Sequence, residues 1–154
     1  MTDMPVTVLV VDDDAIDIAA IRRSFAALHI TNPLVEATNG VEALEHLRGD
    51  NNRPKLARPN IVLVDLNMPR MSGIELLDEL RADPQLCTTV VFVLTTSDAE
   101  EDRWQCYERH IAGYMLKHQP GKHFHESIAL LEHYFRVNEF PPEQRGPTFV
   151  DGRR

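Results

Sequence analysis

The chain lacks several features that would place it in a specialised class. It has two cysteines, Cys87 and Cys106, and they form no CxxC pair. This pattern argues against a disulfide framework and indicates a reducing compartment. The N-terminus has no basic region followed by an apolar stretch, so no signal peptide is predicted, and no apolar run approaches membrane-spanning length. These absences predict a cytoplasmic protein that does not enter a membrane.

A surplus of basic residues is also missing. The formal net charge is -8, which disfavours nonspecific binding to nucleic acid or to anionic lipid. A length of 154 residues with 43% hydrophobic residues is enough to bury one core without metal or disulfide support. We therefore expect one globular domain that binds neither nucleic acid nor a membrane.

Short apolar runs alternate with amphipathic segments along the chain. This alternation predicts an α/β fold with a doubly wound, five-stranded parallel sheet. A helix is expected to begin near Ser72, and the four residues from Ser97 to Glu100 resemble a capping box that opens another. The polar segment 48–59 is a long loop for this kind of fold. The five predicted strands are 8–11, 34–37, 61–64, 90–94 and 113–116.

Polar side chains follow four of these strands. Asp12 and Asp13 follow the first, Asp65 the third, Thr95 the fourth and Lys117 the fifth. Since parallel strands present their carboxyl ends at one edge of the sheet, where ligands bind, these side chains are expected to converge. At about 4 Å, two like charges repel by about 4 kcal/mol at an effective dielectric constant of about 20. The acids therefore predict a cation, and Mg²⁺ prefers such oxygen ligands.

The same edge suits phosphoryl transfer. A carboxylate such as Asp65 can act as the nucleophile. A lysine ammonium and a threonine hydroxyl can contact the phosphoryl oxygens, and this reaction needs positioning and charge neutralisation more than covalent help. The sequence thus predicts a phosphoryl-transfer site built from Asp65, Thr95 and Lys117.

Four motifs carry a resemblance to a known family. They are Val10 to Asp13, Asp65 to Pro69 followed by Gly73, Leu94-Thr95, and Gly113 to Lys117. In this order they resemble the receiver domain of two-component response regulators, over roughly residues 6 to 138. The resemblance implies the flavodoxin-like receiver fold for residues 1–138. It leaves 139–154 as a C-terminal extension, an arm or a disordered tail, with no effector domain.

The resemblance also implies roles for residues at the site. Asp65 would be the phosphoacceptor, taking a phosphoryl group from a histidine kinase, and Lys117 would pair with Asp65 or its phosphate. Mg²⁺ would be held by Asp13 directly, by Asp12 through water, by Asp65 and by the backbone carbonyl of Asn67. Such a protein catalyses only its own phosphorylation and dephosphorylation. It can pass the group to a downstream phosphotransfer protein.

Further roles concern signalling. By the same resemblance, Thr95 would move toward the phosphoryl group and Tyr114 would follow inward, so that the two form a phosphorylation-dependent switch. Asn67 and Ser97 would occupy the two positions that tune dephosphorylation. One departure from the family pattern is Thr96, which stands where a smaller residue is commoner and could crowd the phosphoryl pocket.

Three features resemble the stand-alone regulators that work with phytochrome-type kinases. They are the long loop 48–59, His118 in place of the usual proline after the lysine, and a tail containing Phe140-Pro141-Pro142. The resemblance therefore points to a phytochrome-type histidine kinase as the partner. Because a cis bond before a residue other than proline costs about 3 kcal/mol, the geometry of the Lys117–His118 bond is left open.

Two alternatives stay open at this stage. A haloacid-dehalogenase-like phosphohydrolase also uses an Asp-x-Asp motif after an apolar strand, and residues 12–14 spell it. Such enzymes need a further acidic pair after the lysine, and Lys117 is followed by His-Gln-Pro-Gly. The other alternative is a degenerate receiver that only binds proteins, against which the complete set of acids argues.

The last predicted helix has a wide apolar face. Phe124, Ile128, Leu131 and Phe135 can cover the sheet, which leaves three further apolar side chains without an evident cover, Leu130, Tyr134 and Val137. An exposed apolar patch usually marks an interface. We therefore predict a homodimer built on this helix, with Phe140-Pro141-Pro142 as an extended arm across the partner. Trp104 and Tyr107 fit either an intramolecular cover or a partner surface.

Overall fold

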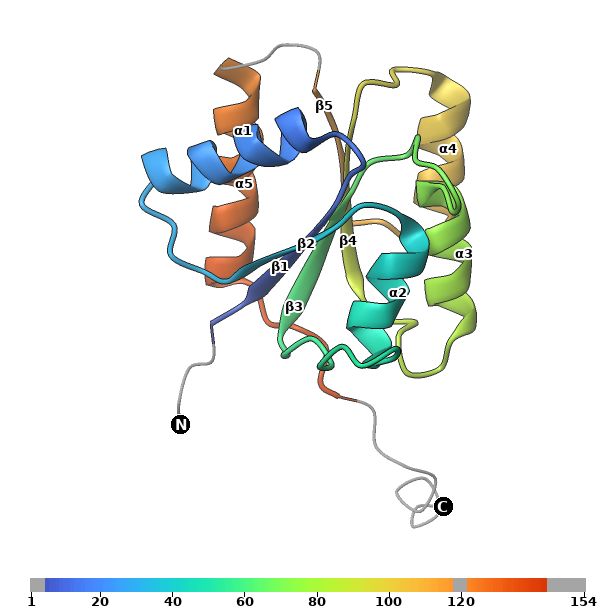
Figure 1. Cartoon of the computed structure of the whole chain (residues 1–154). Coiled ribbons are helices and arrows are strands. Elements are labelled where there is room, and N and C mark those ends of the chain that lie inside the picture. The colour runs from blue at the N-terminus through green and yellow to red at the C-terminus, as the bar shows by residue number, and fades with distance from the viewer. Residues whose placement is uncertain (1–4, 118–121, 144–154) are drawn as a thin grey trace.

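The structure, a computed structural model, describes residues 5–117 and 122–143 of the chain. Five strands alternate with five helices in the described part, as Figure 1 shows. In chain order the elements are β1 (Thr7–Val11), α1 (Ala15–Ala27), β2 (Leu34–Ala37), α2 (Gly40–Arg48), β3 (Asn60–Val64), α3 (Gly73–Ala82), β4 (Val90–Thr95), α4 (Glu100–Glu108), β5 (Gly113–Leu116) and α5 (Lys122–Val137).

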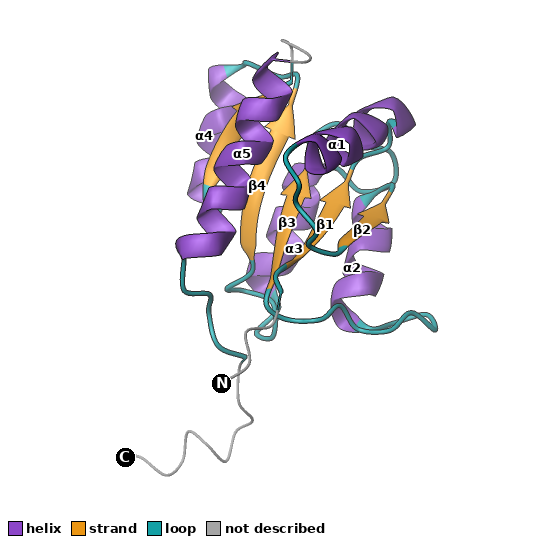
Figure 2. Cartoon of the chain, turned by 90° about the vertical axis from the view of Figure 1, so that its left-hand side faces the viewer, coloured by secondary structure: helices purple, strands orange, loops and turns teal. Residues whose placement is uncertain are grey.

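The strands form one parallel sheet in the order β2-β1-β3-β4-β5. In its register Val10 lies beside Glu36 on one side and Leu63 on the other. Figure 2 shows that the strand arrowheads all point to the same edge of the sheet. The predicted α/β class, strand number and parallel direction are confirmed.

The helices cover both faces of the sheet and create two cores. Helices α1 and α5 lie over one face, and α2, α3 and α4 lie over the other (Figures 1 and 2). Neighbouring residues of β1 serve opposite cores, because strand side chains alternate between faces: Val8 and Val10 face α1 and α5, while Leu9 and Val11 face the other layer. Each fully buried aliphatic side chain of this kind contributes about 1.5–3 kcal/mol relative to an exposed one.

Three helices begin at side-chain caps. Asp14 accepts from the Ile16 N–H at 2.9 Å at the start of α1, and Asn39 caps α2. Ser72 forms a reciprocal capping box with Glu75 at the start of α3, which agrees with the predicted start. These caps satisfy main-chain N–H groups that have no partner inside a helix.

The predicted capping box from Ser97 to Glu100 is wrong. Helix α4 begins after Ala99, which provides no side-chain cap. The Ser97 hydroxyl instead donates to the Asp102 carboxylate at 2.5 Å and accepts the Ala99 N–H at 3.3 Å. The capping-box pattern gave a wrong prediction for two reasons. Ser97 lies two residues before the cap residue Ala99, and its hydroxyl binds Asp102 in the first turn of α4.

The end of α5 differs in part from its prediction. Ile128, Leu131 and Phe135 are buried as predicted, and Phe135 belongs to the same core as Ile21 and Phe25 of α1. The side chain of Phe124 lies outside the described part. Tyr134 was predicted to lack an intramolecular cover, and this is wrong, because its ring stacks edge-on against Phe92 at 5.0 Å.

The beginning of the predicted arm also packs on its own chain. The Phe140 ring contacts Tyr134, with ring centroids 6.0 Å apart and the rings near perpendicular. Glu143 forms an exposed ion pair with Lys55 at 3.6 Å. Residues 144–154 lie outside the described part. Among the described residues, none of the helices is long and apolar enough to span a membrane.

Candidate functional site

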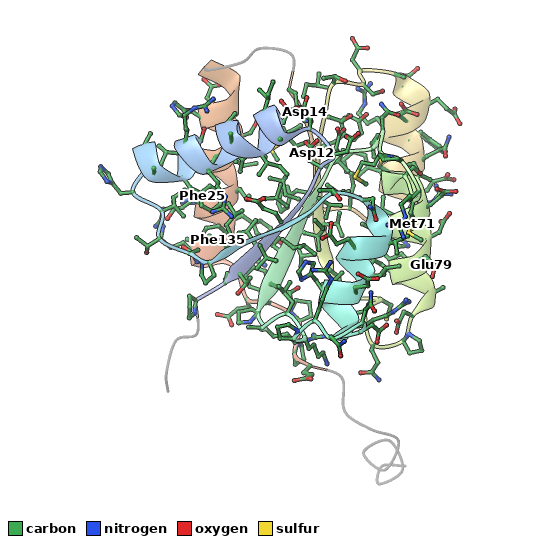
Figure 3. The ribbon with its side chains drawn as sticks, in the orientation of Figure 1. Asp12, Asp14, Phe25, Met71, Glu79 and Phe135 are labelled. Atoms are coloured by element: carbon green, nitrogen blue, oxygen red, sulfur yellow. The ribbon has the colours of Figure 1, made fainter. Side chains whose placement is uncertain are left out.

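The polar residues predicted to converge do so at the carboxyl edge of the sheet. Asp12 and Asp13 follow β1, Asp65 follows β3, and Thr95 is the last residue of β4. Lys117 follows β5 and is buried. Figure 3 places Asp12 at the upper edge, where the chain leaves β1 and turns into α1. The strand ends therefore bring together residues that are up to 105 positions apart in sequence.

Three carboxylates form a cluster at this edge. One oxygen from each of Asp12, Asp13 and Asp65 lies within 4.8 Å of the others. Asp12 is buried, Asp65 is half-buried and Asp13 is exposed, so the cluster opens to solvent on the Asp13 side. Main-chain donors orient two of them: the Asp14 N–H donates to Asp12 at 2.9 Å and the Leu66 N–H to Asp65 at 2.7 Å.

Lys117 is the cation of the site. Its ammonium donates to Asp12 at 2.6 Å, to Asp17 at 2.7 Å and to Asp65 at 3.1 Å. An ammonium has three N–H donors, and all three are used here. The predicted pairing of Lys117 with Asp65 is present, but two further carboxylates share the same ammonium.

Asp17 is the site residue that sequence reasoning missed. It lies in the first turn of α1, which begins three residues after Asp12. One sequence signal could have indicated it. Asp17 lies in the first turn of the helix that follows Asp12 and Asp13, and a first turn placed there lies near the carboxyl edge of the sheet. The sequence did not show which residue it would contact, because Lys117 is 100 positions away.

The buried charges shift one another's protonation. Burial raises the pKa of Asp12, although its hydrogen bond to Lys117 opposes the change. For Lys117, burial lowers the pKa, but hydrogen bonds to Asp12 and Asp17 and the charge of Asp65 outweigh burial and raise it overall. Lys117 therefore stays protonated throughout the neutral range, where it can balance negative charge at Asp65.

Thr95, Ser97 and Tyr114 form a second group beside the acids. The Thr95 side chain is fully buried, and its hydroxyl accepts the Ser97 N–H at 3.3 Å. The Tyr114 hydroxyl donates to the Ser97 carbonyl at 2.8 Å. Ser97 thus links the two residues predicted to form the switch, and its own hydroxyl binds Asp102 in α4. The sequence did not indicate this link.

Asn67 and Thr96 are exposed beside the site. That Thr96 could crowd the phosphoryl pocket stays a prediction. The geometry of the Lys117–His118 bond, which the sequence left open, lies outside the described residues.

Gly73 lets α3 approach the acidic site. Its N–H donates to the Leu66 carbonyl at 2.9 Å. A Cβ atom at this position would lie 2.6 Å from the main-chain oxygen of Asp65, which is closer than any side chain tolerates. The glycine of the Asp65-to-Gly73 motif is therefore required by the close contact between the start of α3 and the residue that carries the central carboxylate.

Comparison with known proteins agrees with this geometry. A model of the response regulator receiver domain matches residues 8–129. Response regulator Rcp1 of Synechocystis sp. is 30% identical over 131 residues, covering 85% of this chain and 89% of that one.

Solved structures of related proteins are also similar. The phosphorylated cyanobacterial phytochrome response regulator RcpA has a TM-score of 0.81 at 28% identity, over 90% of this chain and 100% of that one. The Mn²⁺-bound form of response regulator Rcp1 has a TM-score of 0.80 at 29% identity, with the same coverage. The phosphohydrolase alternative has no such support. The chain belongs to the response regulator receiver domain family, a family of phosphoryl-accepting signalling domains, and it resembles the phytochrome-associated members.

Proposed function

We propose that Asp65 accepts a phosphoryl group from the phosphohistidine of a histidine kinase. One observation carries this proposal: the Asp65 carboxylate lies beside two further acids and a buried ammonium, at the edge of a parallel sheet. In the transfer, an Asp65 oxygen bonds to phosphorus while the bond from phosphorus to the kinase imidazole nitrogen breaks. Lys117 and Thr95 would contact the phosphoryl oxygens as charge develops on them.

A labelling experiment tests this function. The full chain is incubated with acetyl phosphate and a divalent cation, and both the phosphoprotein and the released phosphate are measured. A labile phosphoprotein that approaches one phosphate per chain supports the receiver function. Many turnovers of acetyl phosphate without a phosphoprotein would instead indicate a phosphohydrolase. No labelling and no turnover would indicate a degenerate module that only binds proteins.

Receiver domains bind divalent metal, and we infer that Mg²⁺ is the ion bound here. The fit rests on the three carboxylate oxygens within 4.8 Å, a donor set that hard cations prefer. Asp12, Asp13 and Asp65 would hold the ion, with the Asn67 backbone carbonyl as a further ligand. When bound, Mg²⁺ would neutralise charge between Asp65 and the incoming phosphoryl group.

Asp13→Asn is expected to weaken Mg²⁺ binding by about tenfold, since one anionic ligand is lost at a cost of about 1.4 kcal/mol or more. Asp13 is exposed, so the fold should be unaffected. Calorimetric titration with MgCl₂ measures the change. Asp50→Asn, which removes an exposed charge in the loop between α2 and β3, is the matched control and should bind like the wild type. Unchanged affinity in Asp13→Asn would remove Asp13 from the ligand set.

We also propose that Thr95 and Tyr114 form the phosphorylation-dependent switch. The Thr95 hydroxyl, which accepts the Ser97 N–H, would turn to donate its proton to the phosphoryl group, which alters the loop that Tyr114 also holds. A ligand shifts a two-state equilibrium only through contacts that differ between the states, and this hydrogen bond to the phosphoryl group is such a contact. Asn67 and Ser97, which flank the site, would set the rate of dephosphorylation.

Hydrogen exchange is the measurement for the switch. Phosphorylation should change amide exchange in the loop from Thr95 to Ala99 and in α4 and β5. The β1–β2 half of the sheet serves as an internal control and should be unchanged. Identical exchange in both states over α4 and β5 would contradict the switch.

The kinase partner is proposed to be of the phytochrome type. The support is the similarity to RcpA, which is a phytochrome response regulator, together with the long loop 49–59 between α2 and β3. Phosphotransfer rates from a panel of purified histidine kinases test the proposal, and a phytochrome-type kinase should be fastest. A downstream phosphotransfer protein would then accept the group from Asp65.

We propose a receiver domain over residues 1–138, an extension over 139–154, and a homodimer built on α5. Among the side chains that the structure describes on α5, the large apolar ones left exposed are Leu130 and Val137, which lie two helical turns apart and so share one face. The Phe140 ring packs on Tyr134 of its own chain. We therefore place the dimer interface on the exposed surface of α5 and not on an arm that inserts Phe140 into the partner.

The dimer proposal predicts a dimer mass by light scattering at micromolar concentration. Replacing Leu130 and Val137 together with Glu should give a monomer, because buried charges would be unpaired in the interface. Ile16→Glu on α1, which also replaces an exposed apolar side chain, is the matched control and should leave the dimer intact. A monomer mass for the wild-type chain would refute the proposal.

A further inference from the structure

Lys117 has one partner that is not part of the acidic cluster. Asp12 and Asp65 belong to the cluster, whereas the third carboxylate on the ammonium, Asp17, comes from α1. The Lys117 Nζ lies 2.7 Å from the Asp17 Oδ2, and the side chain of Lys117 is only 5% exposed. Asp17 itself is 25% exposed, so it binds the ammonium from the solvent side of the site.

Asp12 and Asp65 each have more than one binding partner at the site. Under the proposed function, on which this inference rests, Asp12 and Asp65 serve a divalent cation, and Asp65 also receives the phosphoryl group. Both therefore release part of their interaction with Lys117 when the site is in use. Asp17 is not expected to bind the cation or the phosphoryl group, because its oxygens do not belong to the cluster of Asp12, Asp13 and Asp65.

We propose that Asp17 is a positioning residue that holds the Lys117 ammonium at the sheet edge while Asp12 and Asp65 change partners. With one N–H fixed on Asp17, the ammonium keeps another directed at Asp65 and at the phosphoryl oxygens. Without Asp17, the ammonium would be held by Asp12 and Asp65 alone. It would then compete more strongly with a cation for their oxygens.

The test compares Asp17→Asn with Asp14→Asn in the full chain. Both changes remove one negative charge at the start of α1 and nearly preserve side-chain size. The Asp14 side chain caps α1 without touching Lys117, and asparagine caps a helix about as well as aspartate. Asp14→Asn therefore accounts for the loss of charge and leaves only the Lys117 contact to distinguish the variants.

Two measurements are made, the rate of labelling by acetyl phosphate and the affinity for Mg²⁺ by calorimetry. For Asp17→Asn we expect the maximal labelling rate to fall about tenfold, because the asparagine oxygen can still accept from Lys117 but the hydrogen bond loses the negative charge that strengthens it. The acetyl phosphate concentration that gives half the maximal rate should be unchanged. Asp17 contacts Lys117, and in this proposal it does not contact acetyl phosphate. The affinity for Mg²⁺ should fall about threefold or more beyond the effect of Asp14→Asn.

The outcomes separate this proposal from the proposed function. If Asp17→Asn matches Asp14→Asn in either the maximal rate or the Mg²⁺ affinity, Asp17 does not position Lys117. If the wild-type chain is not labelled at all, the proposed function fails, and the Mg²⁺ titrations alone then decide the role of Asp17. Thermal unfolding of both variants checks that neither change acts through a loss of fold.

Discussion

Labelling by acetyl phosphate is expected to disappear when Asp65 is replaced with asparagine. The amide has nearly the same shape as the carboxylate, and its oxygen can still accept the Leu66 N–H that binds Asp65 at 2.7 Å. It is a far weaker nucleophile, so no bond to phosphorus forms. Intact mass spectrometry after incubation with acetyl phosphate and MgCl₂ measures the result: phosphoprotein for the wild type and none for Asp65→Asn.

The fold of this variant should be retained, which makes the result interpretable. Asp65→Asn removes one of three clustered negative charges, so the melting temperature is expected to stay the same or rise. Asp50→Asn, in the exposed loop, is the control and should be labelled at the wild-type rate. Stoichiometric labelling of Asp65→Asn at that rate would assign the phosphoacceptor to another residue.

Much of the fold could be predicted because its signals are local. The runs 34–37 and 113–116 have the bounds that were predicted, and β4 extends one residue further, to Thr95. The central strands β1, β3 and β4 are buried over most of their length, and each contains an apolar run that ends where a polar residue reaches the sheet edge. The same rule predicted the meeting of Asp12, Asp65 and Lys117, since the strand ends of a parallel sheet share one edge.

The parts that could not be predicted depend on contacts between distant segments. Asp17 meets Lys117 although the two residues are 100 positions apart in the sequence. Ser97 forms no capping box because Asp102 provides a partner that the four-residue pattern does not include. Tyr134 is covered by Phe92 and Phe140, a packing that follows from the position of α5 on the sheet. Periodicity indicates which face of a helix is apolar but not what covers it.

Arg81 is the clearest case of a residue with no sequence signal and a large structural role. Its guanidinium donates to four main-chain carbonyls, at 2.8–2.9 Å: those of Arg109 and His110 after α4, and those of Cys87 and Thr89 before β4. The fixed fork of an arginine suits such an array. One side chain in α3 therefore holds together two loops that lie on either side of β4 in the sequence.

Arg81→Met is expected to lower the free energy of unfolding by about 2–4 kcal/mol, because four hydrogen bonds to a charged group are lost and part-buried carbonyls are left without partners. Arg81→Lys should recover only a part, since an ammonium lacks the planar fork that reaches both loops at once. Urea unfolding followed by circular dichroism gives both values. If Arg81→Lys matched the wild type, charge rather than geometry would explain the effect.

An exposed arginine provides the matched control for this prediction. Arg136 pairs with Glu132 one turn away on α5, and its side chain is 57% exposed. A surface pair of this kind contributes about 0.5 kcal/mol or less, so Arg136→Met should unfold at nearly the wild-type urea concentration. Both variants remove one positive charge from a chain of net charge -8. The difference between their free energies of unfolding therefore reports the carbonyl contacts of Arg81. Equal stability of the two variants would show that the four contacts do not hold these loops.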